Sequence, residues 1–176
     1  MPNPPAGKNP DFEHKIIHNC EACSIRELAL CSGLEGNELD ELERIVTRIA
    51  LAPGKTLFYE GDEAQFVFNV TSGAIRLYKL LSDGRRQVTG FMLPGDYLGL
   101  SVHGAYAYCA AAIGETQLCR FATKDLNRLL DRYPSLEKRL LGITRDELAA
   151  AQDQMLLLGR KSPVEKVASF LLDLQL

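Results

Sequence analysis

The period of the apolar residues changes along the chain. Residues 36–51 carry apolar side chains three and four positions apart, from Leu39 to Ile49. This spacing predicts an amphipathic helix with Asn37 as its N-cap. Residues 1–19 are rich in Pro and Asn and lack such a period before Ile16, so we predict a flexible tail there.

From residue 53 the pattern changes to short alternating segments between turns that contain glycine. The segments include FVFNV, AIRLYKL and RQVTGFML. The turns are Pro53-Gly54, Gly61-Asp62, Ser72-Gly73, Asp83-Gly84 and Pro94-Gly95-Asp96. Short strands at even spacing with turns of this kind predict an all-β barrel, sandwich or roll that ends near Phe121.

Two helices are predicted after the strands. The first covers residues 124–133 and ends before Pro134, because a residue that precedes proline avoids the helical conformation. The second runs from Ser135 to about Lys161, and its apolar or small residues recur as the a/d seam of a coiled coil. The seam residues are Leu141, Thr144, Leu148, Ala151, Met155 and Leu158. Because charged residues flank the seam, we predict a dimerisation helix, with packing on its own domain as the alternative.

A last helix is predicted from Ser162 onward, where a capping box places Pro163 at the first helical position. Its apolar residues have no later segment to pack against, so we expect it to begin a further domain that this sequence does not complete. The predicted organisation is a tail at 1–19, a cysteine segment with a β domain at 20–134, a dimerisation helix at 135–161 and the first helix of the next domain at 162–176.

Composition excludes several classes of protein. Hydrophobic residues make up 46% and charged residues 24% of the chain, as in ordinary globular proteins. No apolar run approaches the roughly 20 residues that span a bilayer, and four prolines in the first ten residues replace the apolar core of a secretion signal. We therefore expect a soluble, cytoplasmic protein. The net charge of −3 predicts weak nucleic-acid binding by this chain alone, and the absence of phosphate-loop and nucleophile motifs argues against an enzyme.

The cysteines are the main candidates for chemistry. Three of the five form the pattern Cys20-x2-Cys23-x7-Cys31, which in a reducing cytosol suggests metal or redox chemistry rather than disulfides. A fourth ligand has to come from elsewhere; the candidates are Cys119, Cys109, His14 and His18. Structural zinc, an iron–sulfur cluster and a dithiol switch all fit; the spacing alone does not separate them, and before any resemblance is considered zinc is favoured as the commoner outcome. Apolar surroundings predict that Cys109 fills the core.

Together, these features resemble the Crp/Fnr regulators. The glycine turns look like that family's β-roll, and residues 154–172 look like its junction between dimer helix and DNA-binding domain. With Cys119 near the end of the roll, the chain is similar to the Fnr-type oxygen sensors. The resemblance implies an α+β fold: a cyclic-nucleotide-binding-like double-stranded β-roll with flanking helices and a long C-terminal dimerisation helix. Residues 162–176 would then begin a winged helix-turn-helix DNA-binding domain.

The resemblance also implies a ligand set and a mechanism. The ligands of a [4Fe-4S] cluster would be Cys20, Cys23, Cys31 and Cys119, shielded by Leu30, and zinc becomes the alternative cofactor. Oxygen would degrade the cluster and loosen a homodimer, which would end the control of anaerobic genes. DNA and RNA polymerase would be partners of the full-length protein only. The basic residues near the junction are predicted to form a solvated hinge; they are Arg160, Lys161 and Lys166.

Two other ligands are possible on a β-roll. Cyclic nucleotides are not expected, because Leu100 and Ser101 follow Gly99 where such binders place an acid, and no arginine lies between Arg86 and Arg120 to pair with the phosphate. A haem sensor that uses His103 would leave the N-terminal cysteines unexplained, so it is the weaker alternative.

Overall fold

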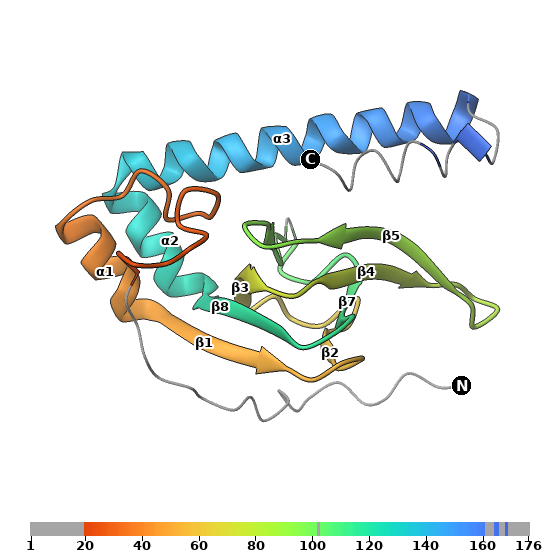
Figure 1. Cartoon of the computed structure of the whole chain (residues 1–176), viewed down its shortest axis with the longest axis horizontal. Coiled ribbons are helices and arrows are strands. Elements are labelled where there is room, and N and C mark those ends of the chain that lie inside the picture. Colours follow the sequence, from red (N-terminus) through yellow and green to blue (C-terminus); the bar gives the residue numbers. More distant parts are fainter. Residues whose placement is uncertain (1–19, 102, 161–163, 166–167, 169–176) are drawn as a thin grey trace. The chain divides into compact units, whose positions relative to one another are not determined.

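A computed structural model describes residues 20–101, 103–160, 164–165 and 168 (Figure 1). Contacts divide the chain into two units, Met1–Arg139 and Leu140–Leu176. The long helix α3 (Pro134–Arg160) begins in the first unit and continues into the second. The sheets and the candidate site belong to the first unit.

The described strands form two four-stranded antiparallel sheets. One has the order β1-β8-β3-β6 and the other the order β2-β7-β4-β5. The bounds are β1 (Val46–Leu51), β2 (Thr56–Phe58), β3 (Phe66–Ser72), β4 (Ile75–Leu80), β5 (Arg86–Met92), β6 (Tyr97–Leu98), β7 (Cys109–Ala112) and β8 (Thr116–Ala122). The predicted segments FVFNV, AIRLYKL and RQVTGFML correspond to β3, β4 and β5.

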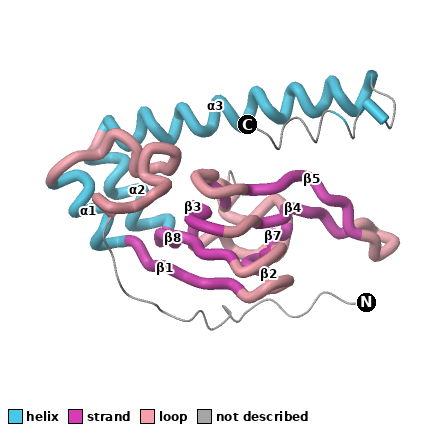
Figure 2. Tube along the Cα trace, in the orientation of Figure 1, coloured by secondary structure: helices cyan, strands magenta, loops and turns pink. Residues whose placement is uncertain are grey.

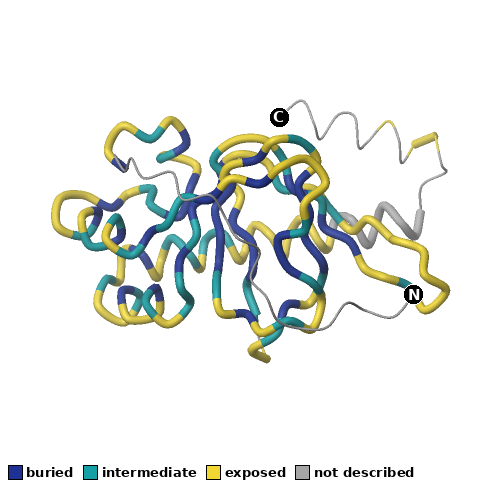
Figure 3. Tube along the Cα trace, turned by 90° about the horizontal axis from the view of Figure 1, so that it is seen from below, coloured by how far each residue is buried: buried dark blue, intermediate teal, exposed yellow. Residues whose placement is uncertain are grey.

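The main core lies between the two sheets. Ile49, Val70 and Leu118 from the first sheet and Ile75 from the second are at most 2% exposed within one apolar cluster. Phe58 and Tyr106 stack inside it with ring centroids 3.7 Å apart, and the Tyr106 hydroxyl donates to the Phe66 carbonyl at 2.7 Å. Figure 3 shows the buried residues along the strands and the exposed ones mainly at turns; β5, in the hairpin with β4, is also mostly exposed. Apolar side chains therefore fill the interior of the roll.

One end of the sheet β1-β8-β3-β6 is also buried on its outer face, whereas Ala50 and Gln117 at the other end are exposed. Successive side chains of a strand point to opposite faces, so Arg48, Cys119 and Asn69 face away from the core that holds Ile49 and Leu118. Near the end of the sheet where β1 begins and β8 ends lie residues 20–36, helix α1 (Asn37–Ile45) and helix α2 (Thr123–Arg132), as Figure 2 shows.

Polar contacts join the helices. Arg132 of α2 donates to both carboxylate oxygens of Glu41 in α1, at 2.8 and 2.9 Å. Ser135, in the first turn of α3, donates to Glu38 at 2.9 Å. These contacts hold α1 against α2 and against the beginning of α3.

The predicted helix over residues 36–51 is wrong in its second half. The helix ends at Ile45, and Val46–Leu51 form β1, because all six residues pair with β8. The apolar spacing fitted both structures, and long-range pairing decided between them. Asn37 is not the N-cap: Gly36 occupies that position at φ 50°, without a capping side-chain hydrogen bond.

The predicted β-roll with flanking helices is confirmed. Helix α2 ends before Pro134, and α3 covers the predicted long helix. Among the described residues, no helix is long and apolar enough to cross a membrane. The tail at 1–19 lies outside the described residues, and of the helix predicted at 162–176 only 164–165 and 168 are described, as helical.

Candidate functional site

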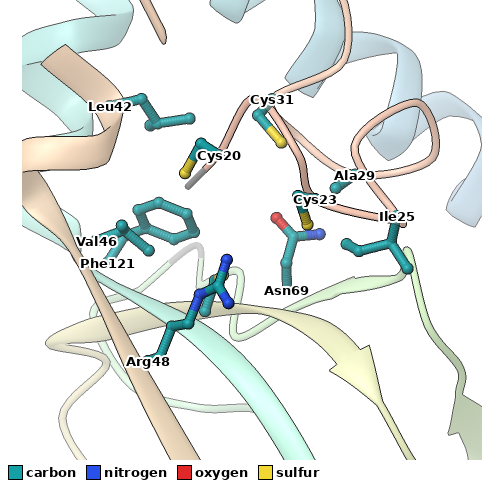
Figure 4. A pocket seen from close by; sticks show the side chains of 11 residues that line it. Cys20, Cys23, Ile25, Ala29, Cys31, Leu42, Val46, Arg48, Asn69 and Phe121 are labelled. Atoms are coloured by element: carbon teal, nitrogen blue, oxygen red, sulfur yellow. The ribbon is translucent and has the colours of Figure 1, made fainter. Parts of the chain in front are cut away.

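Four cysteines meet at one pocket on the outer face of the first sheet (Figure 4). The cavity between its lining residues has a volume of about 20 Å³. Three of its cysteines come from the N-terminal segment and the fourth comes from β8: Cys20, Cys23, Cys31 and Cys119. The remaining lining residues are Ile25, Ala29, Leu42, Val46, Arg48, Asn69 and Phe121. The structure thus brings together the four cysteines that the resemblance implied.

Strand register fixes the floor of this pocket. Cys119 of β8 pairs with Arg48 of β1 on one side and with Asn69 of β3 on the other. Paired residues of an antiparallel sheet share a face, so these three side chains form a row under the cysteine segment. Asn69 is 2% exposed, and its amide nitrogen donates to the carbonyls of Gly95 and Asp96 at 3.1 and 3.2 Å.

The cysteine segment folds as a series of turns rather than as a helix or strand. Backbone hydrogen bonds join Cys23 to Cys20 and Leu34 to Cys31. The Arg26 guanidinium donates to the Leu34 carbonyl at 2.6 Å, and the Cys31 thiol donates to the Arg26 carbonyl at 3.9 Å. These local bonds return Cys31 to the neighbourhood of Cys23, which the seven-residue gap requires.

Three contacts fix the segment to the rest of the first unit. Glu43 of α1 accepts the Cys20 amide at 3.4 Å. Arg139 of α3 donates to the Leu28 and Ala29 carbonyls at 2.6 and 3.2 Å. A Cβ atom on Gly95 would lie 2.7 Å from the Leu28 Cβ, so a glycine there allows the segment to approach the β5–β6 turn.

Burial makes the pocket thiols weak acids. It raises the pKa of Cys20 to about 11, and the nearby Glu43 carboxylate acts in the same direction. It raises the pKa of Cys119 to about 12, against the opposing influence of the Arg48 guanidinium. Burial and the neighbouring Cys23 also raise the pKa of Cys31. The thiols of these three cysteines are therefore protonated at neutral pH in the metal-free chain.

The sulfur atoms lie around the pocket rather than at one point. Within the part of the chain that the structure describes, no three Cys, His, Asp or Glu side chains are arranged to hold a single metal ion. The donors are thiols in a mostly apolar cavity with one arginine, and this donor set fits a thiolate-ligated metal group.

Other predicted residues have different places. Cys109 is buried in the second sheet, where its sulfur accepts the Glu60 amide at 3.3 Å, so it belongs to the core as predicted. Leu30 is fully buried but does not line the pocket, and its shielding role stays a prediction. The alternative ligands His14 and His18 lie outside the described residues.

The two pocket residues with charged or amide side chains were missed by the sequence analysis. Arg48 lay within a predicted helix, and Asn69 was one polar residue in an alternating segment. The strand alternation could have assigned Asn69 to the outer face. Nothing local in the sequence indicates that Arg48 lies opposite Cys119, because only the pairing of β1 with β8 brings them together.

The seam residues lie on α3. Leu141 and Leu148 are exposed, at 48% and 60%. Thr144 donates to the Leu140 carbonyl at 2.9 Å, and Ala151 is exposed. Nothing is described of the side chains of Met155 and Leu158. Dimerisation along this seam stays a prediction.

The region where cyclic-nucleotide binders hold their ligand contains other interactions. The Gly99 amide donates to the Tyr108 hydroxyl at 3.4 Å, and Ser101 donates to the Ala105 carbonyl at 2.9 Å. His103, considered for haem, is exposed.

The roll and its place among known folds define a protein of the cyclic-nucleotide-binding-domain type. Residues 48–133 match the family described as "Cyclic nucleotide-binding domain". The chain is 45% identical over 155 residues to the nitrogen fixation regulation protein FixK of Bradyrhizobium diazoefficiens, which covers 88% of this chain and 65% of the relative. It is 38% identical over 156 residues to the transcriptional activator protein FnrL of Cereibacter sphaeroides, with 89% and 63% covered.

A solved structure agrees with these relatives. FixK2 from Bradyrhizobium japonicum superposes with a TM-score of 0.69 at 38% identity, over 73% of this chain and 65% of that one. The chain belongs to the Crp/Fnr family. It spans slightly less than two thirds of the length of the curated relatives it matches.

Proposed function

We propose that this chain is the sensory and dimerisation part of an oxygen-responsive transcription regulator, with a [4Fe-4S] cluster held by Cys20, Cys23, Cys31 and Cys119. The observation that carries the proposal is the convergence of these four thiols, from two distant parts of the sequence, on one pocket. The names of the relatives support a regulatory role, since they include a regulation protein and a transcriptional activator.

The arrangement of the thiols favours a cluster over a single ion. A cluster distributes its thiolates over several iron atoms, whereas zinc draws four sulfurs to within about 2.3 Å of one centre. Thiols that lie around a pocket, with no three described donors arranged about one point, fit the group with several metal atoms. When bound, the cluster supplies the oxygen-sensitive chemistry, because oxygen oxidises and degrades it.

The chain itself has to give up protons to hold this group. The raised pKa values of Cys20 and Cys119 mean that these thiols are neutral in the metal-free pocket. Metal ligation requires thiolates, so binding releases protons and becomes weaker as the pH falls. Ligation by Cys119 then ties the cysteine segment to β8 through the bound group.

Arg139 offers a route from the pocket to the dimer helix. It belongs to α3 and donates to the backbone of the cysteine segment at Leu28 and Ala29. A change in that segment therefore reaches the helix that carries the seam residues. In this proposal the cluster-bound state favours a homodimer, and DNA and RNA polymerase are partners of the full-length protein.

Cyclic nucleotides are not proposed as ligands. Phe58 and Tyr106 stack within the apolar core of the roll, and the phosphate would lack an arginine between Arg86 and Arg120. A buried phosphate without a cation or several amide donors is unfavourable.

The test is anaerobic purification followed by iron, sulfide and zinc assays and a visible spectrum of the same sample. We expect about four irons and four sulfides per chain, with broad absorbance that bleaches in air. Cys119→Ser should abolish the absorbance, and so should the Ser variants of the other three pocket cysteines. Cys109→Ser is the matched control and should keep it. Stoichiometric zinc in a colourless sample would instead assign the cysteines to a structural zinc site.

A further inference from the structure

Arg48 is a cation in the floor of the cysteine pocket. It lies on β1 directly opposite Cys119, it is half-buried, and Figure 4 shows its guanidinium directed into the pocket. Among the described residues that line the pocket, it is the only charged one.

One nitrogen of this guanidinium lacks a hydrogen-bond partner within the described part of the chain. Its Nε atom is buried and makes no hydrogen bond there. The ion pairs found among the described residues involve other arginines and a lysine. Glu43, the acid beside Cys20, accepts the Cys20 amide instead. Arg48 is half-buried, and withdrawing part of a cation from water without a partner of opposite sign is unfavourable.

We propose that Arg48 supplies the counter-charge for a thiolate-ligated cluster in this pocket. The inference rests on the proposed function. A cluster core of charge 2+ with four thiolates carries a net charge of about −2 in a site of low dielectric constant. The buried Nε–H is a free donor for a cluster or thiolate sulfur. Arg48 is thus a positioning and tuning residue, while the cysteines are the ligands.

The charge of Arg48 also sets how readily the cluster is oxidised. Oxidation makes the cluster less negative, and a nearby cation favours the more negative, reduced state. Arg48 therefore protects the cluster from premature oxidation. Removing the charge lowers the reduction potential and speeds the loss of the cluster in air.

The experiment compares Arg48→Met, Arg48→Gln and Arg48→Lys in the whole chain after anaerobic cluster reconstitution. Cluster loss in air is followed by visible absorbance, and the midpoint potential is measured by redox titration. We expect loss about tenfold faster in Arg48→Met and Arg48→Gln, in line with other residues that support metal ligands, together with a lower potential. Arg48→Lys keeps the charge and should remain within about threefold of wild type.

Arg76→Met is the matched control. Arg76 also has a buried Nε without a partner among the described residues, but it lies on β4 in the other sheet. The cluster lifetime and the midpoint potential of the Arg76→Met variant should equal those of wild type. A third readout needs no cluster: the melting temperature of metal-free Arg48→Met should equal or exceed that of wild type, because the substitution removes a half-buried cation whose Nε makes no hydrogen bond among the described residues.

The outcomes separate this inference from the proposed function. A wild-type chain that takes up no iron contradicts the proposed function itself. A wild-type chain that takes up the cluster, with Arg48→Met equal to it in lifetime and potential, overturns the role of Arg48 alone. Arg48→Lys losing its cluster as fast as Arg48→Met would also overturn it, since the charge would then be irrelevant. The role of Arg48 would be supported if Arg48→Lys holds a cluster while Arg48→Met and Arg48→Gln fail to take one up.

Discussion

The sheet β1-β8-β3-β6 carries very different side chains on its two faces. The inner face presents Ile49, Val70 and Leu118 to an apolar core with stacked aromatic rings. The outer face presents Arg48 and Cys119, with Asn69, to the cysteine pocket. Adjacent residues of one strand therefore fill the core on one side and line the pocket on the other, because a strand alternates its side chains.

Substitutions of Leu118 and Cys119, which are neighbours on β8, should show the largest difference in stability between the two faces. Leu118→Ala removes a fully buried side chain from the inner face and should lower the free energy of unfolding by about 2–5 kcal/mol. Cys119→Ser should lower that of the metal-free chain by only about 1 kcal/mol. Denaturant unfolding with a chelator and a reductant measures both. Equal losses would mean that the outer face is simply a second core.

The next effect concerns the close approach of the cysteine segment to the β5–β6 turn. Gly95→Ala requires an unfavourable φ of 103° and drives a Cβ into Leu28, so we expect a loss of about 2–3 kcal/mol. Gly84→Ala is the control, since Gly84 has φ 83° and open space around it, and should cost about 1 kcal/mol. Tryptic cleavage after Arg26 should be faster in Gly95→Ala than in wild type, and unchanged in Gly84→Ala. Unchanged cleavage would show that the segment does not depend on this contact.

A smaller effect is expected from Arg139→Ala. It removes two hydrogen bonds to the cysteine segment and should cost about 1 kcal/mol. Lys138→Ala, its exposed neighbour, should change stability by less than about 0.5 kcal/mol. Sedimentation with and without the cluster tests the coupling: in Arg139→Ala the dimer fraction should no longer follow cluster content. A response equal to that of wild type would place the coupling elsewhere.

The smallest effect at neutral pH comes from thiol ionisation. The folded chain holds the pKa of Cys20 at about 11 and that of Cys119 at about 12, above the ordinary thiol value of 9.0. The contribution of the neutral thiols to the free energy of unfolding is therefore fully present below pH 9. It is lost as the pH rises toward 12, because the thiols ionise first in the unfolded chain. Unfolding of the metal-free chain at pH 8 and 10 should show this fall. The double variant Cys20→Ser, Cys119→Ser should show a shallower one.

Local pattern was enough for much of the fold. Alternation between glycine turns predicted β3, β4 and β5, and the proline at position 134 separated α2 from α3. The cysteine spacing indicated the chemistry but left its type open, and the resemblance to Crp/Fnr regulators supplied Cys119 as the fourth member. These features depend on residues close together in sequence, whose conformations follow from period and turn chemistry.

The pairing of distant strands decided the rest. Residues 46–51 fit a helical period as well as an alternating one, and only the six-residue ladder with β8 makes them a strand. That ladder also places Arg48 beside Cys119 and creates the floor of the pocket. The apolar pattern within residues 46–51 does not encode this register. The register is the one that gives β1 and β8 together the lowest free energy, and these two segments meet only when the chain folds.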